Sequence, residues 1–196
     1  MKSHVVAQYD GTSSSAFFER IQRLAALQVD YIQLRAPALF DRAVYEAGMR
    51  CRGLIGSPTR FLINRRYDIA MSCSADGVHL PGPGLPASAI RSAAKKMLIG
   101  RSCHSLSDCR AAVAEDLDYV LLGPVFDTRS KKASARVSIS ELAEASALEI
   151  EVFAIGGVSR DNLQALKETG IAGVAAITMF MHDEPLEQIV EEVRTL

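Results

Sequence analysis

Short apolar runs and longer amphipathic stretches alternate along the whole chain of 196 residues. Runs that are apolar throughout are expected as strands covered on both faces, and helical crossovers between them enforce parallel pairing. The pattern predicts strands at His4 to Gln8, Tyr31 to Arg35, Arg60 to Asn64, Gly77 to Leu80, Met97 to Ser102, Tyr119 to Val125, Glu151 to Gly157 and Gly173 to Ile177.

The stretches between these runs predict helices at Ser14 to Gln28, Leu39 to Ile55, Leu106 to Ala114, Ile139 to Ala147, Arg160 to Thr169 and Pro185 to Val193. Weaker helical patterns cover Tyr67 to Ser74 and Pro86 to Lys95. Eight such units fit an α/β fold, a compact (β/α)₈ TIM barrel with eight parallel strands and surrounding helices. An open doubly wound sheet is the alternative, because local pattern does not show closure. No linker or charge block interrupts residues 1–196, so we expect a single domain.

Composition excludes several classes of function. Lys and Arg number 22 against 23 Asp and Glu, which argues against a nucleic-acid surface. No apolar run approaches the roughly 20 residues of a membrane span, and nothing near Met1 resembles a signal segment, so we expect no membrane partner and a cytoplasmic location. The four cysteines lack metal-ligand spacing and are expected as reduced thiols, mostly in the core. The sequence leaves homo-oligomerisation open.

Chemistry in such a barrel lies at the carboxyl ends of the strands, and one strand there is unusual. The apolar run from Tyr119 ends in glycine, hydroxyl and paired basic residues, which indicates a site for an anion. Thr128, Lys131 and Lys132 are therefore candidate substrate-binding residues. A solvated loop is the alternative for this segment.

The last two predicted strands end in residues suited to holding a phosphate. Gly156 and Gly157 precede a predicted helix, so their amides can approach an anion without side-chain obstruction. Ile177 and Thr178 follow the final strand, and in TIM barrels a phosphate is often bound after these two strands. A tight strand-to-helix turn is the alternative for the glycine pair.

Polar residues at the other strand ends complete the candidate site. Arg35 can bind an anionic group through two hydrogen bonds from its guanidinium. Gln33, two residues earlier on the same strand, points to the same side. Asn64 and Ser102 are small groups able to orient a ligand, although both are also common in turns and caps. His104, just past a strand end, is the candidate catalytic proton carrier. His79, inside a strand, is expected as a hydrogen-bonded residue of the barrel interior.

Taken together, these residues resemble the thiamine phosphate synthase and TenI family. The matching motifs run in family order at Ile32 to Arg35, Leu62 to Asn64, Asp76 to Leu80, Ile99 to Ser102, Asp118 to Phe126 with Thr128 and Lys131-Lys132, and Ala154 to Gly157. The resemblance implies a phosphate-binding (β/α)₈ barrel. The synthases join a thiazole phosphate to a pyrimidine diphosphate and release pyrophosphate with magnesium, whereas the TenI branch isomerises a thiazole carboxylate phosphate.

The resemblance also implies roles for individual residues. Gln33 and Asn64 would contact a pyrimidine or thiazole ring. Arg35, Ser102 and Lys132 would face a diphosphate. The thiazole phosphate would be held by the last two strand ends, through Gly157, Ile177 and Thr178.

Several positions depart from the synthase pattern. Pro37 stands where a synthase has a lysine, and Arg65 and Gly84 stand where it has two metal-binding aspartates. Magnesium needs hard oxygen ligands, so we expect no metal ligand here, and magnesium only if synthase activity is retained. Pro124 replaces the histidine that transfers protons in the tautomerases, which leaves His104 for that role.

Three hypotheses follow for the function. The first, which the departures favour, is a TenI-like enzyme that acts on a thiazole phosphate and requires no cofactor. The second is a thiamine phosphate synthase with an altered metal site. The third is a non-catalytic barrel that binds a thiazole phosphate or thiamine phosphate.

Overall fold

The eight predicted strands close into an all-parallel barrel in the order β1 to β8. The computed structural model describes residues 1–12, 14–82, 84–127 and 136–196. The strands are β1 Lys2–Gln8, β2 Tyr31–Arg35, β3 Arg60–Asn64, β4 Gly77–Leu80, β5 Leu98–Cys103, β6 Tyr119–Leu122, β7 Glu151–Ile155 and β8 Gly173–Ala176. Closure occurs between β1 and β8, where Lys2 pairs with Gly173 and Val5 with Ala176. The predicted TIM barrel is confirmed, and the open sheet is excluded.

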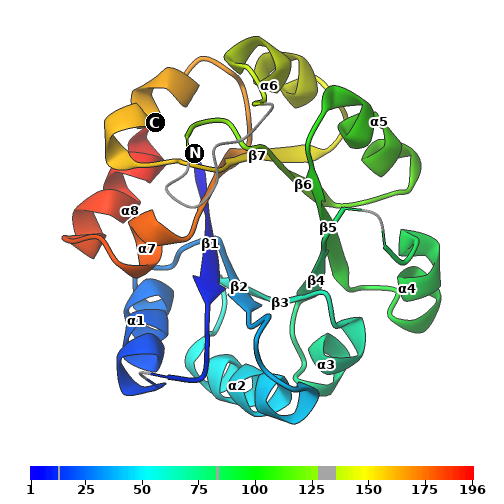
Figure 1. Cartoon of the computed structure of the whole chain (residues 1–196), viewed down its shortest axis with the longest axis vertical. Coiled ribbons are helices and arrows are strands. Elements are labelled where there is room, and N and C mark those ends of the chain that lie inside the picture. The colour runs from blue at the N-terminus through cyan, green and yellow to red at the C-terminus, as the bar shows by residue number, and fades with distance from the viewer. Residues whose placement is uncertain (13, 83, 128–135) are drawn as a thin grey trace.

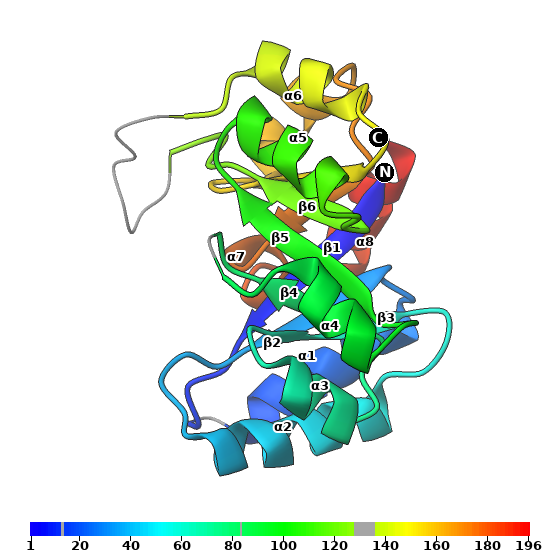
Figure 2. The ribbon, with the colours of Figure 1, turned by 90° about the vertical axis from the view of Figure 1, so that its right-hand side faces the viewer.

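Helices form a ring outside the barrel (Figures 1 and 2). They are α1 Ser14–Ala26, α2 Asp41–Leu54, α3 Tyr67–Ser72, α4 Ala87–Ala93, α5 Leu106–Ala114, α6 Ile139–Ser146, the 3₁₀ helix η1 Arg160–Leu166, the short α7 Thr178–Met181 and α8 Leu186–Thr195. The final helix shows why they form: Leu186, Ile189, Val190 and Val193 recur at helical spacing, and all four are buried. Burying each stabilises the fold by roughly 1.5–3 kcal/mol. Within the described residues no helix is long and apolar enough to cross a membrane.

Most predicted elements shift by one to three residues at their ends, and three of the differences have a clear physical reason. The strand from Glu151 ends at Ile155 rather than Gly157, because Gly156 and Gly157 adopt left-handed φ values of 93° and 68°. The strand from Tyr119 ends at Leu122, since Pro124 has no amide for the ladder. The segment predicted as an α-helix from Arg160 is a 3₁₀ helix, and amides around it bond three residues back, as from Asn162 to Ser159.

Two apolar regions hold the barrel together. One lies between the strands and the surrounding helices and contains all four cysteines, which are buried and free, as predicted. The other fills the barrel interior with Val6, Leu62, Tyr119, Leu121, Phe153 and Ala175. Tyr119 lies across β5, where a Cβ on Gly100 would stand 1.9 Å from its ring. Glycine at that position therefore makes room for the tyrosine.

Two hydrogen-bonded groups also occupy the barrel interior. His79 Nδ1 lies 3.1 Å from the Tyr119 hydroxyl, and its Nε2 lies 2.9 Å from Ser102 Oγ. His4 Nε2 lies 3.0 Å from Gln33 Oε1. The prediction that His79 belongs to the barrel interior is confirmed. Burial lowers the pKa of His4 to about 4, and burial followed by the charge of His4 lowers the pKa of His79 well below its ordinary value.

At the amino ends of the strands, a separate polar group involves Glu151. Its carboxylate pairs with Lys2 and accepts a 3.2 Å hydrogen bond from the Tyr31 hydroxyl. Burial, then the neighbouring Glu151 charge, raises the pKa of Tyr31. The phenol therefore remains a donor at neutral pH.

We predict that stability falls on mild acidification because of His4. The unfolded histidine takes up a proton below about pH 6.5, whereas the folded one remains neutral until about pH 4. The unfolded state thus binds more protons in this window, so stability is full above pH 6.5 and declines as the pH falls. His4 alone should reduce the free energy of unfolding by about 2 kcal/mol between pH 7 and 5.

Urea unfolding across that pH range measures the effect. His4→Gln should lower overall stability but remove this part of the pH dependence. The control His182→Asn changes an exposed histidine and should leave the wild-type slope intact. An unchanged slope in His4→Gln would contradict the prediction.

Candidate functional site

The carboxyl ends of β7 and β8 surround a hollow of about 610 Å³. Three other hollows among the described residues are smaller, at about 490, 430 and 270 Å³. All four residues predicted to hold a phosphate line it: Gly156, Gly157, Ile177 and Thr178. The two segments, about twenty positions apart in sequence, are adjacent because β7 and β8 pair directly.

Backbone conformation shapes the β7 side of this hollow. A Cβ on Gly156 would stand 2.6 Å from Pro124 Cα, and one on Gly157 would stand 2.3 Å from the Asp127 carbonyl oxygen. With their left-handed φ values, these contacts require glycine at both positions. The Gly157 carbonyl accepts a 2.9 Å bond from Asn162 Nδ2, while its amide has no acceptor among the residues described. That amide is available to a ligand oxygen.

The β8 side is formed by the short helix α7. Its first residue is Thr178, and Ile177 precedes it as the N-cap without a side-chain hydrogen bond. A helix N-terminus presents unpaired amides and a partial positive charge. The sequence pattern missed α7 because it has only four residues. Strand ends followed by a short extra helix are the usual phosphate-binding arrangement of TIM barrels.

Three carboxylates also line the hollow, those of Asp127, Asp161 and Asp183. Asp127 forms an ion pair with Arg136, which offsets its charge. Binding of an anion here would therefore depend on the backbone amides and the α7 terminus rather than on a surplus of cationic side chains in the described lining.

The strands β2, β3 and β5 carry a second polar region. Gln33 Nε2 donates a 3.0 Å hydrogen bond to Asn64 Oδ1, which joins two of the predicted substrate-binding residues. Ser102, at the end of β5, contacts the interior through His79. Arg35 hydrogen bonds to Gln8 Oε1 and forms no ion pair with a carboxylate among the described residues. Its guanidinium is therefore available for an anion.

His104 lies where β5 leads into α5. Its Nδ1 is 2.6 Å from the Gly123 carbonyl oxygen, and since a carbonyl only accepts, Nδ1 carries a proton. In the neutral ring Nε2 is then the nitrogen able to accept a proton. The side chain is exposed and does not line the β7–β8 hollow. Thr128, Lys131 and Lys132 fall in 128–135, outside the described residues.

The residues present do not fit a magnesium ion. Arg65, directly after β3, offers only donors, and Gly84 after β4 has no side chain. The neighbouring Asn64 oxygen already accepts from Gln33. In the described part of the chain, no group of three His, Cys, Asp or Glu is placed to hold a metal. Arg65 also adopts a left-handed φ of 69°, a conformation uncommon for a side chain of its size.

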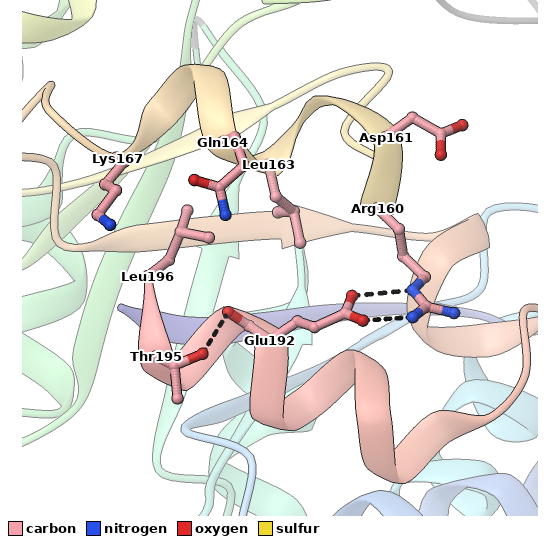
Figure 3. Close-up of a pocket in the computed structure, with 8 residues that line it drawn as sticks. All are labelled: Arg160, Asp161, Leu163, Gln164, Lys167, Glu192, Thr195 and Leu196. Atoms are coloured by element: carbon pink, nitrogen blue, oxygen red, sulfur yellow. Dashed lines mark hydrogen bonds and ion pairs between the residues drawn. The ribbon is translucent and has the colours of Figure 1, made fainter.

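A further hollow lies between η1 and α8 on the outer wall (Figure 3). Arg160 and Glu192 form an ion pair across it, with two hydrogen bonds. Because the charges are paired and the strand ends lie elsewhere, this hollow is not the candidate site.

Sequence reasoning missed two members of the interior network, His4 and Tyr119. His4 is a polar residue directly before the apolar run Val5 to Ala7 of its strand, a signal available from the sequence. Its contact with Gln33 was not predictable from that signal, because the two residues belong to different strands.

Both the sequence and the fold match known proteins. A family model described as thiamine monophosphate synthase matches residues 4–180. Thiamine-phosphate synthase of Pyrococcus horikoshii is 33% identical over 167 residues, covering 84% of this chain and 81% of the relative. The Clostridium tetani enzyme of the same name is 32% identical over 165 residues, covering 83% and 79%.

Among solved structures, thiamine phosphate pyrophosphorylase from Pyrococcus furiosus superimposes with a TM-score of 0.85 at 27% identity. The match covers 99% of this chain and 94% of that structure. The family resemblance seen in the motifs is thereby confirmed. The chain belongs to the thiamine phosphate synthase and TenI family.

Proposed function

We propose that the protein is an enzyme of thiamine biosynthesis that joins a thiazole phosphate to a pyrimidine diphosphate. The observation that carries this proposal is a barrel mouth with two polar regions, the β7–β8 hollow and the Gln33, Asn64, Ser102 and Arg35 group. A coupling reaction needs two such regions. The relatives support it, since those matched over about four fifths of their length are named synthases.

This proposal reverses the preference drawn from the sequence departures. Pro37, Arg65 and Gly84 favoured a TenI-like isomerase, whereas the comparisons favour the synthase alternative. The departures concern how a diphosphate is held, and they leave the phosphate-binding glycines intact.

In the proposed reaction each half of the site has its own task. Gly157 and Thr178 hold the thiazole phosphate through backbone amides and a hydroxyl. Gln33 and Asn64 orient the pyrimidine ring, while Arg35 and Ser102 face its diphosphate. A bond forms between the thiazole nitrogen and the pyrimidine methylene carbon as the carbon–oxygen bond to diphosphate breaks. The diphosphate leaves with that electron pair, and Arg35 stabilises its charge.

The proposal includes no step that uses magnesium, because Arg65 and Gly84 supply no oxygen ligand. Arg35 ends β2 and Arg65 directly follows the neighbouring strand β3, on the proposed diphosphate side. In the proposed reaction, the positive charge of these arginines stabilises the negative charge of the leaving diphosphate.

A TenI-like isomerase is the second candidate function. The observation favouring it is the His104 ring, whose Nδ1 is fixed by Gly123 and whose Nε2 is left to exchange a proton. Such a reaction needs one phosphate and no diphosphate. Binding without turnover is the third alternative.

The first prediction here concerns the reaction itself. Incubation with thiazole phosphate and hydroxymethylpyrimidine diphosphate should yield thiamine phosphate and pyrophosphate, and turnover should persist when EDTA replaces magnesium. Product analysis by mass spectrometry checks both results. Isomerisation of a thiazole carboxylate phosphate without coupling would instead establish the second candidate, and binding without any turnover the third. Coupling abolished by EDTA would contradict the metal-independent site.

The second prediction concerns Arg35. Arg35→Ala should lower kcat/KM for coupling roughly 10- to 150-fold, because a hydrogen bond to a charged group contributes about 1.5–3 kcal/mol. Arg42→Ala is the matched control, since Arg42 is an exposed arginine in α2 whose one ion-pair partner among the described residues is Glu46. Equal kcat/KM values for the two variants would show that Arg35 does not bind the substrate.

The third prediction concerns the phosphate-binding glycine. Gly157→Ala places a Cβ into the Asp127 backbone at a left-handed φ, so affinity for inorganic phosphate should be lost. Stability should fall by more than about 1 kcal/mol. Isothermal titration and urea unfolding measure the two effects. Gly53→Ala is the control, because no atom lies within 4 Å of its added Cβ, and this helical site should gain roughly 0.5–1 kcal/mol. Undiminished phosphate binding in Gly157→Ala would contradict the assignment.

A further inference from the structure

A buried tyrosine and a buried histidine stand behind Ser102. The Tyr119 hydroxyl lies 3.1 Å from His79 Nδ1, and His79 Nε2 lies 2.9 Å from Ser102 Oγ. Tyr119 is 1% exposed and His79 2%, whereas Ser102 is only half-buried at the end of β5. The contacts form a line from the barrel interior to its mouth.

The direction of these hydrogen bonds follows from counting protons. A neutral imidazole carries one N–H and one acceptor nitrogen, and His79 is buried as the neutral form. If Nδ1 carried the proton, the Tyr119 hydroxyl would accept, and its own hydrogen would have no acceptor. An unsatisfied buried donor costs about 1–3 kcal/mol. Tyr119 therefore donates to Nδ1, and the imidazole proton resides on Nε2.

Among the described residues, no acceptor other than His79 is hydrogen bonded to the Tyr119 hydroxyl. Its hydroxyl has His79 as its hydrogen-bond partner, and the neighbouring His4 Nδ1, although buried, has no partner. The His4 and Tyr119 rings are 5.4 Å apart between centroids, in contact but not hydrogen bonded. The Tyr119 to His79 direction thus satisfies both groups.

These hydrogen-bond directions determine the role of the Ser102 hydroxyl. Its oxygen accepts the Nε2–H of His79, so its own hydrogen is not used inside the barrel. That hydrogen is left for a ligand. The serine then acts as a donor toward an acceptor oxygen, rather than as an acceptor.

A second line of hydrogen bonds, from His4 through Gln33 to Asn64, also ends in a donor at the barrel mouth. Gln33 Oε1 can only accept, so His4 Nε2 donates to it, and Gln33 Nε2 donates to Asn64 Oδ1. The amide hydrogens of Asn64 are left for a ligand. Both lines therefore present donors at the mouth, which selects a ligand rich in acceptor oxygens or ring nitrogens.

We propose that Tyr119 and His79 are positioning residues that fix the Ser102 hydroxyl as a hydrogen-bond donor to an anionic oxygen of the bound ligand. The identity of that oxygen, in a diphosphate, rests on the proposed function. The direction of the hydrogen bonds does not, because it follows from burial, from the distances and from the single proton of a neutral imidazole.

The direct test is the tautomer of His79. Long-range ¹H–¹⁵N spectra of the ¹⁵N-histidine-labelled protein should show His79 with a protonated Nε2 and an unprotonated Nδ1. In Tyr119→Phe, which keeps the ring beside Gly100 but removes the hydroxyl, this preference should weaken or invert. A protonated Nδ1 in the wild-type protein would overturn the proposal, whatever reaction the enzyme performs.

The second test uses inorganic pyrophosphate as the probe in isothermal titration. Tyr119→Phe should weaken binding roughly 3- to 10-fold, the range of one net hydrogen bond, because Ser102 can then donate to His79 instead. Ser102→Ala should weaken binding at least as much, and the double variant no further. Tyr31→Phe is the matched control, since its hydroxyl binds Glu151 at the opposite end of the barrel.

The outcomes separate the two proposals. If Tyr119→Phe weakens binding equally in the wild-type and Ser102→Ala backgrounds, Tyr119 does not act through Ser102, and the positioning role fails. If the wild-type protein binds no pyrophosphate, the diphosphate subsite of the proposed function fails, while the tautomer measurement still decides the direction of the bonds.

Discussion

The pairing of β1 with β8 is the contact on which the rest of this structure depends. It joins residues near the two ends of the sequence, and it leaves the parallel sheet without a free edge. The approach is close, because a Cβ on Gly173 would stand 2.1 Å from the Lys2 carbonyl oxygen. Closure brings the carboxyl ends of all eight strands to one rim, where the hollow at Gly157 and Thr178 and the polar group at Gln33 and Ser102 share a single mouth.

Closure also creates an interior that must be filled, and this chain fills part of it with polar rings. His4, His79 and Tyr119 are nearly inaccessible to solvent, so burial keeps the imidazoles neutral and the phenol protonated. For Tyr119 and His79 the hydrogen-bond direction is fixed, because its reversal would leave the buried phenol hydrogen without an acceptor. The same side chains therefore fill the barrel interior and orient hydrogen-bond donors at its mouth.

The β7–β8 side of the barrel mouth, where we propose that a phosphate binds, fits the family more fully than the opposite side. The glycine pair and the short α7 form a backbone surface that does not depend on side-chain charge. The opposite side has Arg65 and Gly84 in place of the carboxylates that magnesium requires. The fold is retained across these changes because both positions lie outside the strands and bear no part of the core.

Local sequence pattern was enough to predict the eight strands, most of the helices, the four residues that line the β7–β8 hollow and the interior place of His79. Each of these depends on neighbours close along the chain or on the strand-end rule. Tertiary structure alone decided that the sheet closes, that Arg160–Leu166 is a 3₁₀ helix, and that α7 begins at Thr178. It also decided that Tyr119 reaches Ser102 through His79. These features join residues from different strands, and local periodicity contains no information about which strand will lie beside which.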